Sequence, residues 1–407
     1  MKRIAIVGAS MRCYAMFVDR VKKVIPDDVK FVGVYDINMG RCRVLKGYIG
    51  DECTIYHGFE EMLDAEKPDG VLVTTTDDTH HDYVVRALNK GYDVYSEKPL
   101  TNTFERCLAI RDAEKKSGKI VTTTFNCRYM PYLEHIKELV MSGRIGKIYS
   151  MNYEYALKRT HGGDYFKRWH RFMEHSQGML LHKSTHHLDV ANWIIDSEPR
   201  YVTALANRVH YGDAGEYRAE RCTQCSYSDK CQSYVYDKEN ERLLKQFYYD
   251  NEMEDGYIRD RCAFTPDADI NDNYSVSVMY QNGALLTYTL QMASMHEGYN
   301  ITITGEKGVI IASKWSPSEN NNGKDIIKLI TSGGKTEIIE YEKPTGCHDG
   351  ADDRLIKMLF NGYESDPLNQ CAGSFEGVVS AMVGIAGNMS IKEGKTIDLK
   401  PYIDKLR

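Results

Sequence analysis

The segment Gly91-Tyr92-Asp93-Val94-Tyr95-Ser96-Glu97-Lys98-Pro99 decides the fold class of this 407-residue chain. Its first part predicts a strand over Asp93–Ser96, and Glu97 and Lys98 follow where that strand ends. A parallel nucleotide-binding sheet binds its ligands at the carboxyl ends of its strands, so this segment offers one carboxylate and one ammonium there. The chain also begins with Lys2-Arg-Ile-Ala-Ile-Val-Gly8, a buried-strand pattern that ends in a glycine turn.

The first 125 or so residues alternate short apolar runs with amphipathic stretches. The apolar runs predict strands at Ile4–Val7, Phe31–Tyr35, Gly70–Thr74, Asp93–Ser96 and Ile120–Thr124. The amphipathic stretches predict helices at Cys13–Ile25, Phe59–Asp64, His80–Lys90 and Thr103–Lys116. This alternation favours a Rossmann-type α/β domain over residues 1–125, a doubly wound parallel sheet with helices on both faces.

From about Pro131 the pattern changes to alternating runs joined by tight turns. The clearest is a hairpin at Gln281-Asn282-Gly283, because Asn-Gly accepts positive φ at little cost. A long helix rich in Ala, Gly and Met is predicted at Cys371–Ile391. Residues 126–407 are therefore expected to form an α+β domain with a large, mostly antiparallel sheet. A polar, Cys-containing insertion is expected at about 212–272.

Composition excludes several classes of function. The net charge of −6 leaves no basic excess for nucleic acid or an anionic membrane. No apolar run approaches the roughly 20 residues needed to span a bilayer. The apolar run Ile4–Val7 is too short for a signal peptide. The eleven cysteines are scattered and odd in number, which favours a reducing compartment. We expect a cytoplasmic protein.

The turn after the first strand, Gly8-Ala9-Ser10-Met11-Arg12-Cys13, keeps one glycine of the usual dinucleotide pattern. By itself it also fits an ordinary strand-to-helix turn. Ser10 is small enough for close approach of a pyrophosphate, and Arg12 offers a charge-assisted bond to it. Asp36, at the end of the second strand, would accept hydrogen bonds from the adenosine ribose. The carboxylate of Asp36 would repel a 2′-phosphate, which favours NAD over NADP. The nearby Arg41 keeps NADP as an alternative.

The run Val73-Thr-Thr75-Thr-Asp77-Asp-Thr-His80 follows another predicted strand. Hydroxyl groups, Asp77 and His80 would lie near the nicotinamide ribose. Asp77 or Thr79 fits equally well as the N-cap of the helix His80–Lys90. Both roles are expected to apply in part.

Taken together, Gly8, Asp36, Thr75 to His80 and Glu97-Lys98-Pro99 resemble the Gfo/Idh/MocA family of NAD(P)-dependent sugar oxidoreductases. The similarity continues through Asn126-Cys-Arg128-Tyr-Met-Pro131 and Gly143-Arg-Ile-Gly146. The chain departs from the family at Ser10, Cys13 and Thr76. The resemblance implies a nicotinamide cofactor, and cofactor contacts are expected from Gly8, Ser10, Met11, Arg12, Asp36, Thr75, Asp77, His80, Glu97, Lys98 and Asn126.

The segment from Gly178 to Trp193 concentrates titratable groups. His182, His186 and Asp189 recur at helical spacing, so they are expected to share one face. The resembled family carries an Asp-x-x-x-His pair here that faces the nicotinamide. His186 keeps the histidine and His182 replaces the aspartate. The catalytic residues implied are Lys98 and His186, with His182 as a partner. Lys98, partly desolvated, would have a lowered pKa.

Aromatic and cationic side chains upstream suit a carbohydrate. Trp169 and its neighbours pair an apolar stacking face with charged donors, although a solvated basic helix is an equal alternative. His348 begins a turn that resembles one in sugar-acting relatives, and an N-cap at Asp349 or Asp352 is the alternative. The substrate-binding residues expected are Arg128, Trp169, His170, Arg171, Lys183 and His348.

The cysteines of the insertion, Cys222, Cys225, Cys231 and Cys262, are predicted as ligands of a structural zinc ion. The insertion has little apolar content, and a metal crosslink would stabilise it. An iron–sulfur cluster, reduced thiols or a disulfide are the alternatives.

The expected function is hydride transfer between a nicotinamide cofactor and a secondary alcohol of a sugar, glycoside or cyclitol. A glycoside hydrolase that works by transient oxidation and elimination is the second hypothesis. A non-catalytic sugar or nucleotide sensor is the third. The resemblance further implies a homodimer or homotetramer formed through the antiparallel sheet.

Overall fold

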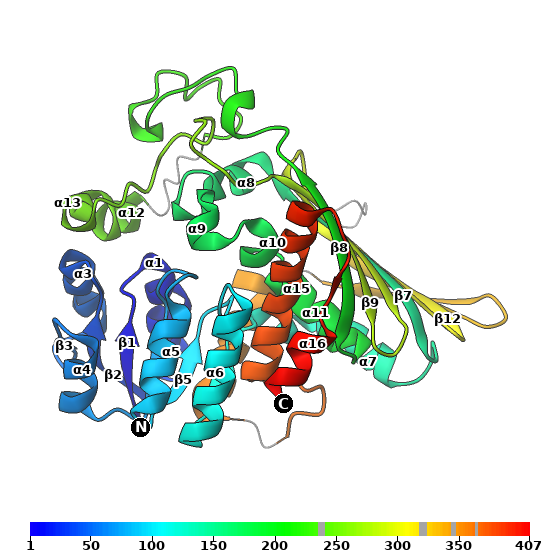
Figure 1. Cartoon of the computed structure of the whole chain (residues 1–407), viewed down its shortest axis with the longest axis horizontal. Helices are drawn as coiled ribbons and strands as arrows, with labels where there is room; N and C mark the ends of the chain where they lie inside the picture. Colours follow the sequence, from blue (N-terminus) through cyan, green and yellow to red (C-terminus); the bar gives the residue numbers. More distant parts are fainter. Residues whose placement is uncertain (235–240, 317–323, 343–346, 363–364) are drawn as a thin grey trace.

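A computed structural model describes residues 1–234, 241–316, 324–342, 347–362 and 365–407. These residues form two sheets, one of six strands and one of nine. Figure 1 shows the first sheet with its helices beside the second, larger sheet, and the segment around residues 208–272, in green, above them. The predicted fold class, a Rossmann-type parallel sheet plus an α+β part with a mostly antiparallel sheet, is confirmed.

The first sheet has the strand order β3-β2-β1-β4-β5-β6, and every described pairing in it is parallel. Its strands are β1 (Lys2–Val7), β2 (Val29–Tyr35), β3 (Thr54–Ile55), β4 (Gly70–Val73), β5 (Asp93–Ser96) and β6 (Val121–Thr123). Its helices are α1 (Met11–Cys13), α2 (Asp19–Val24), α3 (Met39–Ile49), α4 (Phe59–Glu66), α5 (His80–Asn89) and α6 (Phe104–Ser117). A π-helical turn, Tyr14–Val18, joins α1 to α2.

The alternation of side chains along β1 explains why both faces of this sheet are covered. Ile4 and Ile6 point into a core with Phe17, whereas Ala5 and Val7 point into the core on the other side. All four β1 residues are fully buried. A strand that is apolar at consecutive positions is the pattern expected for a parallel sheet with helices on both faces.

The parallel sheet and its helices form what we call the first half of the molecule. Two of its elements, α3 and β3, were not predicted from the sequence. Helix α3 buries Cys42, Leu45 and Ile49, and Asn38 caps its first turn by accepting from Arg41 N at 3.0 Å. Its remaining positions are mostly charged or glycine, so its apolar stripe is too thin to stand out in the sequence. Strand β3 has only two residues.

The second sheet has the order β14-β13-β12-β11-β7-β10-β9-β8-β15. Its pairings are antiparallel except for β7 with β10. The strands are β7 (Ile148–Lys158), β8 (Pro199–Asn207), β9 (Asn273–Tyr280), β10 (Leu285–Ser294), β11 (Glu297–Gly305), β12 (Gly308–Ser316), β13 (Asp325–Thr331), β14 (Lys335–Tyr341) and β15 (Ile397–Asp398). The hairpin predicted at Asn282-Gly283 joins β9 to β10, with Gly283 at φ +86°.

Helices cover one face of the second sheet. The helices that follow the first sheet along the chain, not all of which pack on the second sheet, are α7 (Pro131–Met141), α8 (Arg159–Tyr165), α9 (Met173–Ser176), α10 (Met179–His182), α11 (Thr185–Ile195), α12 (Glu241–Phe247), α13 (Glu252–Asp255), α14 (Ala351–Asn361), α15 (Ser374–Glu393) and α16 (Lys400–Ile403). Helix α15 packs close to α10, because a Cβ on Gly384 would lie only 2.9 Å from Leu181 Cα. This close packing fixes the position of His182 at the end of α10.

Helix α14 returns to the first half of the molecule. Leu355, Ile356 and Leu359 join the same core as Ile4 and Ile6. The first sheet therefore completes one of its faces with residues from near the end of the chain.

One helix was predicted through His182, His186 and Asp189, and the structure has two. Helix α10 ends at His182 and α11 begins at Thr185. Asp189 lies three residues after His186 on α11, and its carboxylate is buried against Arg128 in a two-pronged ion pair with both N–O distances 2.7 Å. The prediction of one continuous helix was therefore wrong, and Asp189 is engaged in an ion pair with Arg128.

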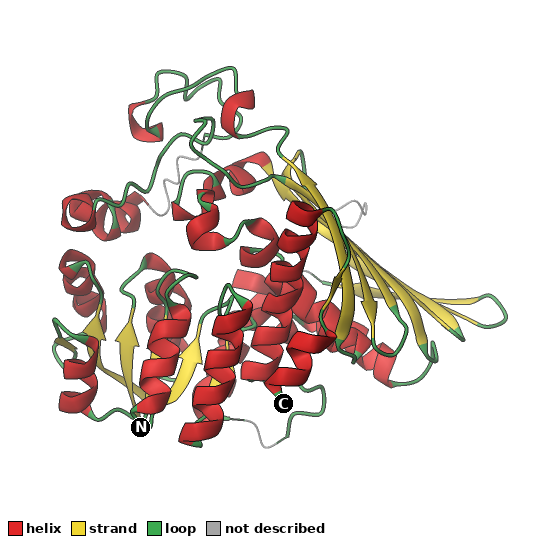
Figure 2. Ribbon diagram, in the orientation of Figure 1, coloured by secondary structure: helices red, strands yellow, loops and turns green. Residues whose placement is uncertain are grey.

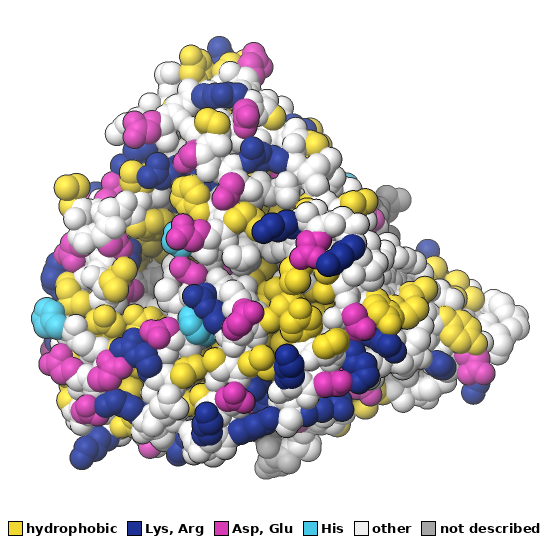
Figure 3. All heavy atoms as spheres, viewed as in Figure 1, with side chains coloured by type: hydrophobic (Ala, Val, Ile, Leu, Met, Phe, Trp, Pro, Cys, Tyr) yellow, Lys and Arg dark blue, Asp and Glu magenta, His cyan; other side chains and the backbone are white. Residues whose placement is uncertain are grey.

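Figure 2 shows the insertion between β8 and β9 as mostly loop with short helices. On the face drawn in Figure 3, acidic and basic side chains are interspersed. Among the described residues, no helix combines the length and the apolar character needed to cross a membrane.

Candidate functional site

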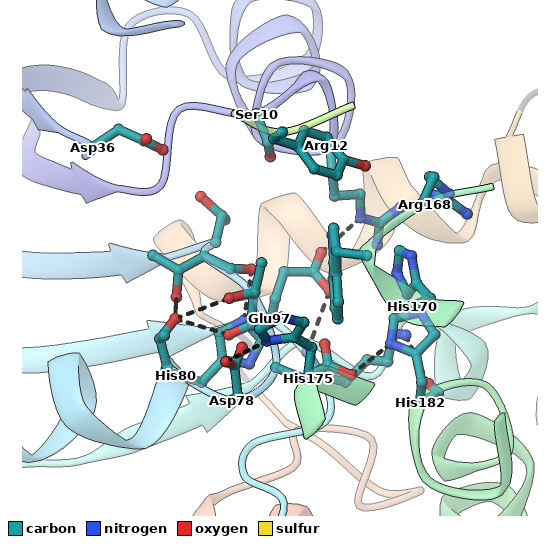
Figure 4. Close-up of a pocket in the computed structure, with 18 of the residues that line it drawn as sticks. Ser10, Arg12, Asp36, Asp78, His80, Glu97, Arg168, His170, His175 and His182 are labelled. Atoms are coloured by element: carbon teal, nitrogen blue, oxygen red, sulfur yellow. Dashed lines mark hydrogen bonds and ion pairs between the residues drawn. The ribbon is translucent and has the colours of Figure 1, made fainter. Parts of the chain in front are cut away.

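A cavity of about 660 Å3 lies at the carboxyl ends of strands β1, β2, β4 and β5. Residues of α8 and α10 and of the insertion line its other side. Figure 4 shows Asp36 at one end and Arg168, His170 and His182 at the other, with Glu97 between them. The strand ends of the first sheet therefore form one wall of the site, and helices and loops of the rest of the chain form the opposite wall.

The turn after β1 makes close contact with the end of β4. Gly8 has φ +100°, and a Cβ there would come within 2.6 Å of the backbone of Thr74 and Thr75. Only glycine meets both conditions without strain. Ser10 caps α1 by accepting from Cys13 N at 3.1 Å, and it lines the cavity. A tight turn that opens a helix at this edge is the backbone arrangement that binds phosphate groups.

Asp36 is held at the end of β2 by three donors. Its carboxylate accepts from Ala9 N at 2.7 Å, from Asn38 N at 2.8 Å and from Arg41 Nη2 at 3.1 Å. These bonds fix the carboxylate at the cavity wall next to the turn. This is the place that the sequence analysis gave it.

Glu97 and Lys98 face the centre of the cavity. Glu97 accepts from Arg12 Nε at 2.8 Å, which ties the end of β5 to α1. Lys98 Nζ donates to the carbonyl oxygen of His182 at 3.0 Å, across the boundary between the two halves. Burial lowers the pKa of Lys98 to about 8, although the charges of Asp77 and Glu97 act in the opposite direction. Lys98 can therefore exchange a proton near neutral pH.

His182 is hydrogen-bonded to Asp77 across the same boundary. The distance from His182 Nδ1 to Asp77 Oδ2 is 2.6 Å, and both side chains are buried. Burial and the neighbouring charge of Lys98 lower the pKa of His182 well below its ordinary value. A neutral histidine that a carboxylate orients through Nδ1 has Nε2 left for proton transfer.

Two further histidines line the cavity with unused hydrogen-bonding groups. Within the described residues, His186 Nδ1 and His170 Nδ1 are buried and have no hydrogen-bond partner. Burial lowers the pKa of both, so both are neutral. Trp169 stacks on His170 with ring centroids 3.7 Å apart. Buried polar atoms without partners are rare and mark places where a ligand can bond.

Of the predicted cofactor residues, these line the cavity: Ser10, Arg12, Asp36, Thr75, Asp77, His80, Glu97 and Lys98. His80 sits between two carbonyl oxygens, with Nδ1 2.8 Å from Pro99 O and Nε2 3.1 Å from Thr75 O. Asn126 donates to Asp352 at 2.8 Å. Met11 N donates to Tyr248 Oη at 3.3 Å.

The predicted substrate residues divide into two groups. Trp169, His170, Lys183 and His348 line the cavity. Arg128 and Arg171 do not line the cavity. Arg128 is buried against Asp189, and Arg171 Nη2 pairs with Asp267 at 2.5 Å in the base of the insertion.

The structure does not support the predicted zinc ion. The four cysteines, Cys222, Cys225, Cys231 and Cys262, line one small cavity. Yet the part of the chain that the structure describes has no group of three or more His, Cys, Asp or Glu side chains placed to hold a metal.

The insertion is fixed instead by charge pairs. Arg221 pairs with Glu252 and with Asp260 at 2.5 Å each, and Arg259 pairs with Asp164 of α8 at 3.0 Å. A polar segment with little apolar content can thus be ordered without the metal crosslink that the sequence analysis invoked.

Several cavity residues were not predicted as site residues. His161, Tyr165 and His175 come from short helices that the sequence analysis did not single out. Tyr248, Asp255 and Tyr257 come from the insertion. No local pattern marks the insertion residues, because their place depends on how the insertion folds back onto the first half.

Two family models match the chain. The model described as "Oxidoreductase family, NAD-binding Rossmann fold" (GFO_IDH_MocA) matches residues 2–125. The model described as "Oxidoreductase family, C-terminal alpha/beta domain" (GFO_IDH_MocA_C) matches residues 137–399.

Curated relatives agree with these matches. A protein of Bacillus subtilis (strain 168) named as an oxidoreductase, YteT, is 32% identical, and the match covers 98% of each chain. Inositol 2-dehydrogenase of Klebsiella pneumoniae is 28% identical over 42% of this chain and 48% of its own length. Among solved structures, a levoglucosan dehydrogenase in complex with NADH and L-sorbose has a TM-score of 0.69. It covers 98% of this chain and 99% of its own at 13% identity, which supports the fold alone.

Proposed function

Because the chain belongs to the Gfo/Idh/MocA family of NAD-binding oxidoreductases, we propose that it is an NAD(P)-dependent dehydrogenase of a sugar, glycoside or cyclitol. The observation that carries this proposal is the meeting of Lys98 with the pair His182–Asp77 in one cavity at the edge of the first sheet. The inositol 2-dehydrogenase among its relatives supports the substrate class.

In this proposal residues 1–125 bind the dinucleotide and residues 126–407 bind the substrate. The first half fits a dinucleotide in two respects. The Gly8 turn leaves no room for a side chain, which brings the backbone close to a pyrophosphate. Asp36 stands where the adenosine ribose would present its hydroxyls. The cavity volume of about 660 Å3 is within the usual range for small-molecule sites.

The nicotinamide ring, when bound, supplies the acceptor for the hydride that leaves the alcohol carbon. The protein must then remove the hydroxyl proton. Lys98 Nζ is the proposed proton acceptor, because its lowered pKa leaves part of it uncharged near neutral pH. Its bond to the His182 carbonyl holds the amine in place.

His182 is the proposed partner of Lys98. Asp77 fixes its ring through Nδ1, so Nε2 can accept or return a proton on the substrate side. His186 takes the place of the family histidine, and its unpartnered Nδ1 supports a bond to substrate or cofactor. Trp169, His170, Lys183 and His348 are the proposed substrate contacts.

The proposal is tested by incubating the protein with NAD or NADP and a panel of cyclitols, aldoses and glycosides. We expect the absorbance of reduced nicotinamide to appear with at least one of them. The variant Lys98→Ala should lose this turnover and still bind nucleotide. Lys90→Ala is the control, because Lys90 is an exposed lysine of the same half, paired with Asp64.

Other outcomes would replace the proposal. Release of a sugar without net nicotinamide reduction would mean the redox-assisted hydrolase. Ligand-dependent thermal stabilisation that Lys98→Ala retains, with no turnover of any substrate, would mean a sensor.

We also propose a homodimer or homotetramer in the cytoplasm. The uncovered face of the second sheet exposes Leu205, Met279 and Leu285, which a second copy could bury. The cysteines found unpaired in the described residues support a reducing compartment. Light scattering of the purified protein tests the first point, and a monomeric mass at micromolar concentration would contradict it.

A further inference from the structure

The insertion between β8 and β9 folds back onto the first half of the molecule. Figure 1 shows α12 and α13 next to α3. Phe247 at the end of α12 is fully buried in the core that contains β1, and its ring lies 6.1 Å from that of Tyr48. This apolar anchor docks the insertion firmly on α3.

Polar contacts then fix the insertion along the edge of the site. Asn38 Nδ2 donates to the carbonyl oxygen of Asn251 at 2.9 Å, and Gly40 N donates to Glu254 Oε2 at 2.8 Å. Tyr248 accepts from Met11 N at 3.3 Å, so the insertion also reaches the turn after β1. The docking is therefore specific to the adenosine side of the proposed cofactor site.

Arg41 lies at the centre of this contact between two carboxylates. Its Nη2 is 3.1 Å from Asp36 Oδ1 and 2.5 Å from Asp255 Oδ2. All three side chains line the cavity and are mostly buried, with exposures of 11–12%. The group as a whole carries one net negative charge.

An arginine near the acidic residue that ends β2 is the usual means of accommodating the 2′-phosphate of NADP. Here that arginine is engaged by a carboxylate that comes from far along the chain. A 2′-phosphate would have to displace Asp255 from Arg41 and would then face two carboxylates instead of one. NAD, with a neutral 2′-hydroxyl, meets neither penalty.

We infer that the insertion completes the adenosine end of the nucleotide site, and that Asp255 holds Arg41 so that the site selects NAD over NADP. Asp255 is a specificity residue that acts through Arg41. The inference rests on the proposed function and adds to it the choice of cofactor.

Equilibrium binding of NAD and of NADP, measured by calorimetry on the full chain, tests the inference. The wild type should bind NAD more tightly than NADP. Asp255→Asn should lower the ratio of the NADP to the NAD dissociation constant by about tenfold, the size of one charge-assisted hydrogen bond. The double variant Asp255→Asn/Arg41→Ala should lose that gain, because it removes the cation that receives the phosphate.

Asp250→Asn is the matched control. Asp250 is an exposed carboxylate of the same insertion, paired with Lys245 at 3.6 Å, and its substitution should leave the ratio unchanged. If Asp255→Asn binds NAD as the wild type does and the ratio does not move, the inference is overturned and the proposed function stands. If the wild type binds neither nucleotide, both are overturned.

Discussion

The protonation state of Lys98 connects the site to pH. Its pKa is lowered to about 8 by burial, so the ammonium form dominates below this pH and the amine above it. Because the amine is the form that accepts the hydroxyl proton, kcat/KM for alcohol oxidation should rise with pH and level off above about pH 8. The reverse reduction should fall over the same range. Steady-state kinetics across pH in both directions would measure this.

The variant Lys98→Arg tests whether Lys98 causes this rise of kcat/KM with pH. Arginine keeps its charge at every accessible pH, so the rise of kcat/KM with pH should vanish together with most of the activity. If kcat/KM of Lys98→Arg still rose with pH, but at a lower pH than in the wild type, a histidine would be the base.

Asp77 controls the orientation of His182. Replacing Asp77 with Asn keeps the shape, removes the negative charge of the acceptor and adds an N–H donor, so the Nδ1–H form of the ring is no longer selected. We expect kcat to fall by roughly 10²–10⁴-fold, the usual contribution of a positioned acid or base, with nucleotide affinity little changed. Asp82→Asn serves as the control, because Asp82 is an exposed neighbour paired with Arg86. Equal losses in the two variants would exclude a special role for Asp77.

Single residues also show where the sequence stops being informative. Asp36, Glu97 and Lys98 could be placed because each directly follows a predicted strand. Asp77 was interpreted as a cofactor contact or a helix cap, since its partner His182 is 105 residues away along the chain. Asp189 was grouped with the histidines by spacing, and its buried partner Arg128 is 61 residues away. Partners at such distances leave no local pattern.

Among the elements, the docking of α12 makes the sharpest prediction. Phe247→Ala removes a fully buried ring that packs against Tyr14 and Tyr48. The free energy of unfolding should fall by about 3–5 kcal/mol if the insertion unfolds together with the rest. If instead only the insertion detaches from the first half, the rate of amide exchange at Gly40, whose N–H donates to Glu254, should rise.

Denaturant unfolding and hydrogen exchange distinguish these two results. Met253→Ala is the control, since Met253 is 97% exposed in the same segment. If Phe247→Ala behaved like Met253→Ala in both measurements, the apolar anchor would have no energetic role.

The elements that could be predicted are those with a strong apolar period. Strands β1, β2, β4 and β5 were predicted from short apolar runs, and the β9–β10 hairpin from alternating runs and its Asn-Gly turn. Helix α3 was missed because its apolar stripe is thin. The break between α10 and α11 was missed because the spacing of His182 and His186 fits a continuous helix. There the packing of α10 on Gly384 and the contacts of α11 decide the geometry.

At the scale of the whole molecule, one ligand should stabilise both halves. The cavity has walls from the first half, from α10 and from the insertion, so a nucleotide bound there joins all three. At a concentration 100 times its dissociation constant, NAD should raise the free energy of unfolding by about 2.7 kcal/mol. Hydrogen exchange should slow in residues 241–257 as well as around Gly8. Protection confined to the first half would contradict a nucleotide site that α10 and the insertion also line.

The arrangement of the whole molecule was predictable only in part. The alternation of strands and helices indicated a parallel sheet, and the later run of hairpins indicated a second, antiparallel one. How the two halves meet was not predictable, because it depends on pairs such as Lys98 with the His182 carbonyl and His175 with Asp78. These pairs form only after each half has its own shape.

The return of α14 to the first sheet has a consequence for synthesis of the protein. Ile4 and Ile6 emerge from the ribosome about 350 residues before Leu355 and Ile356, which join the same core. The nascent nucleotide-binding part therefore keeps one apolar flank exposed until residues 355–356 have been made. A truncated gene that stops after residue 125 should yield an aggregation-prone, chaperone-dependent fragment. Adding the α14 segment as a separate peptide should restore the solubility of this fragment.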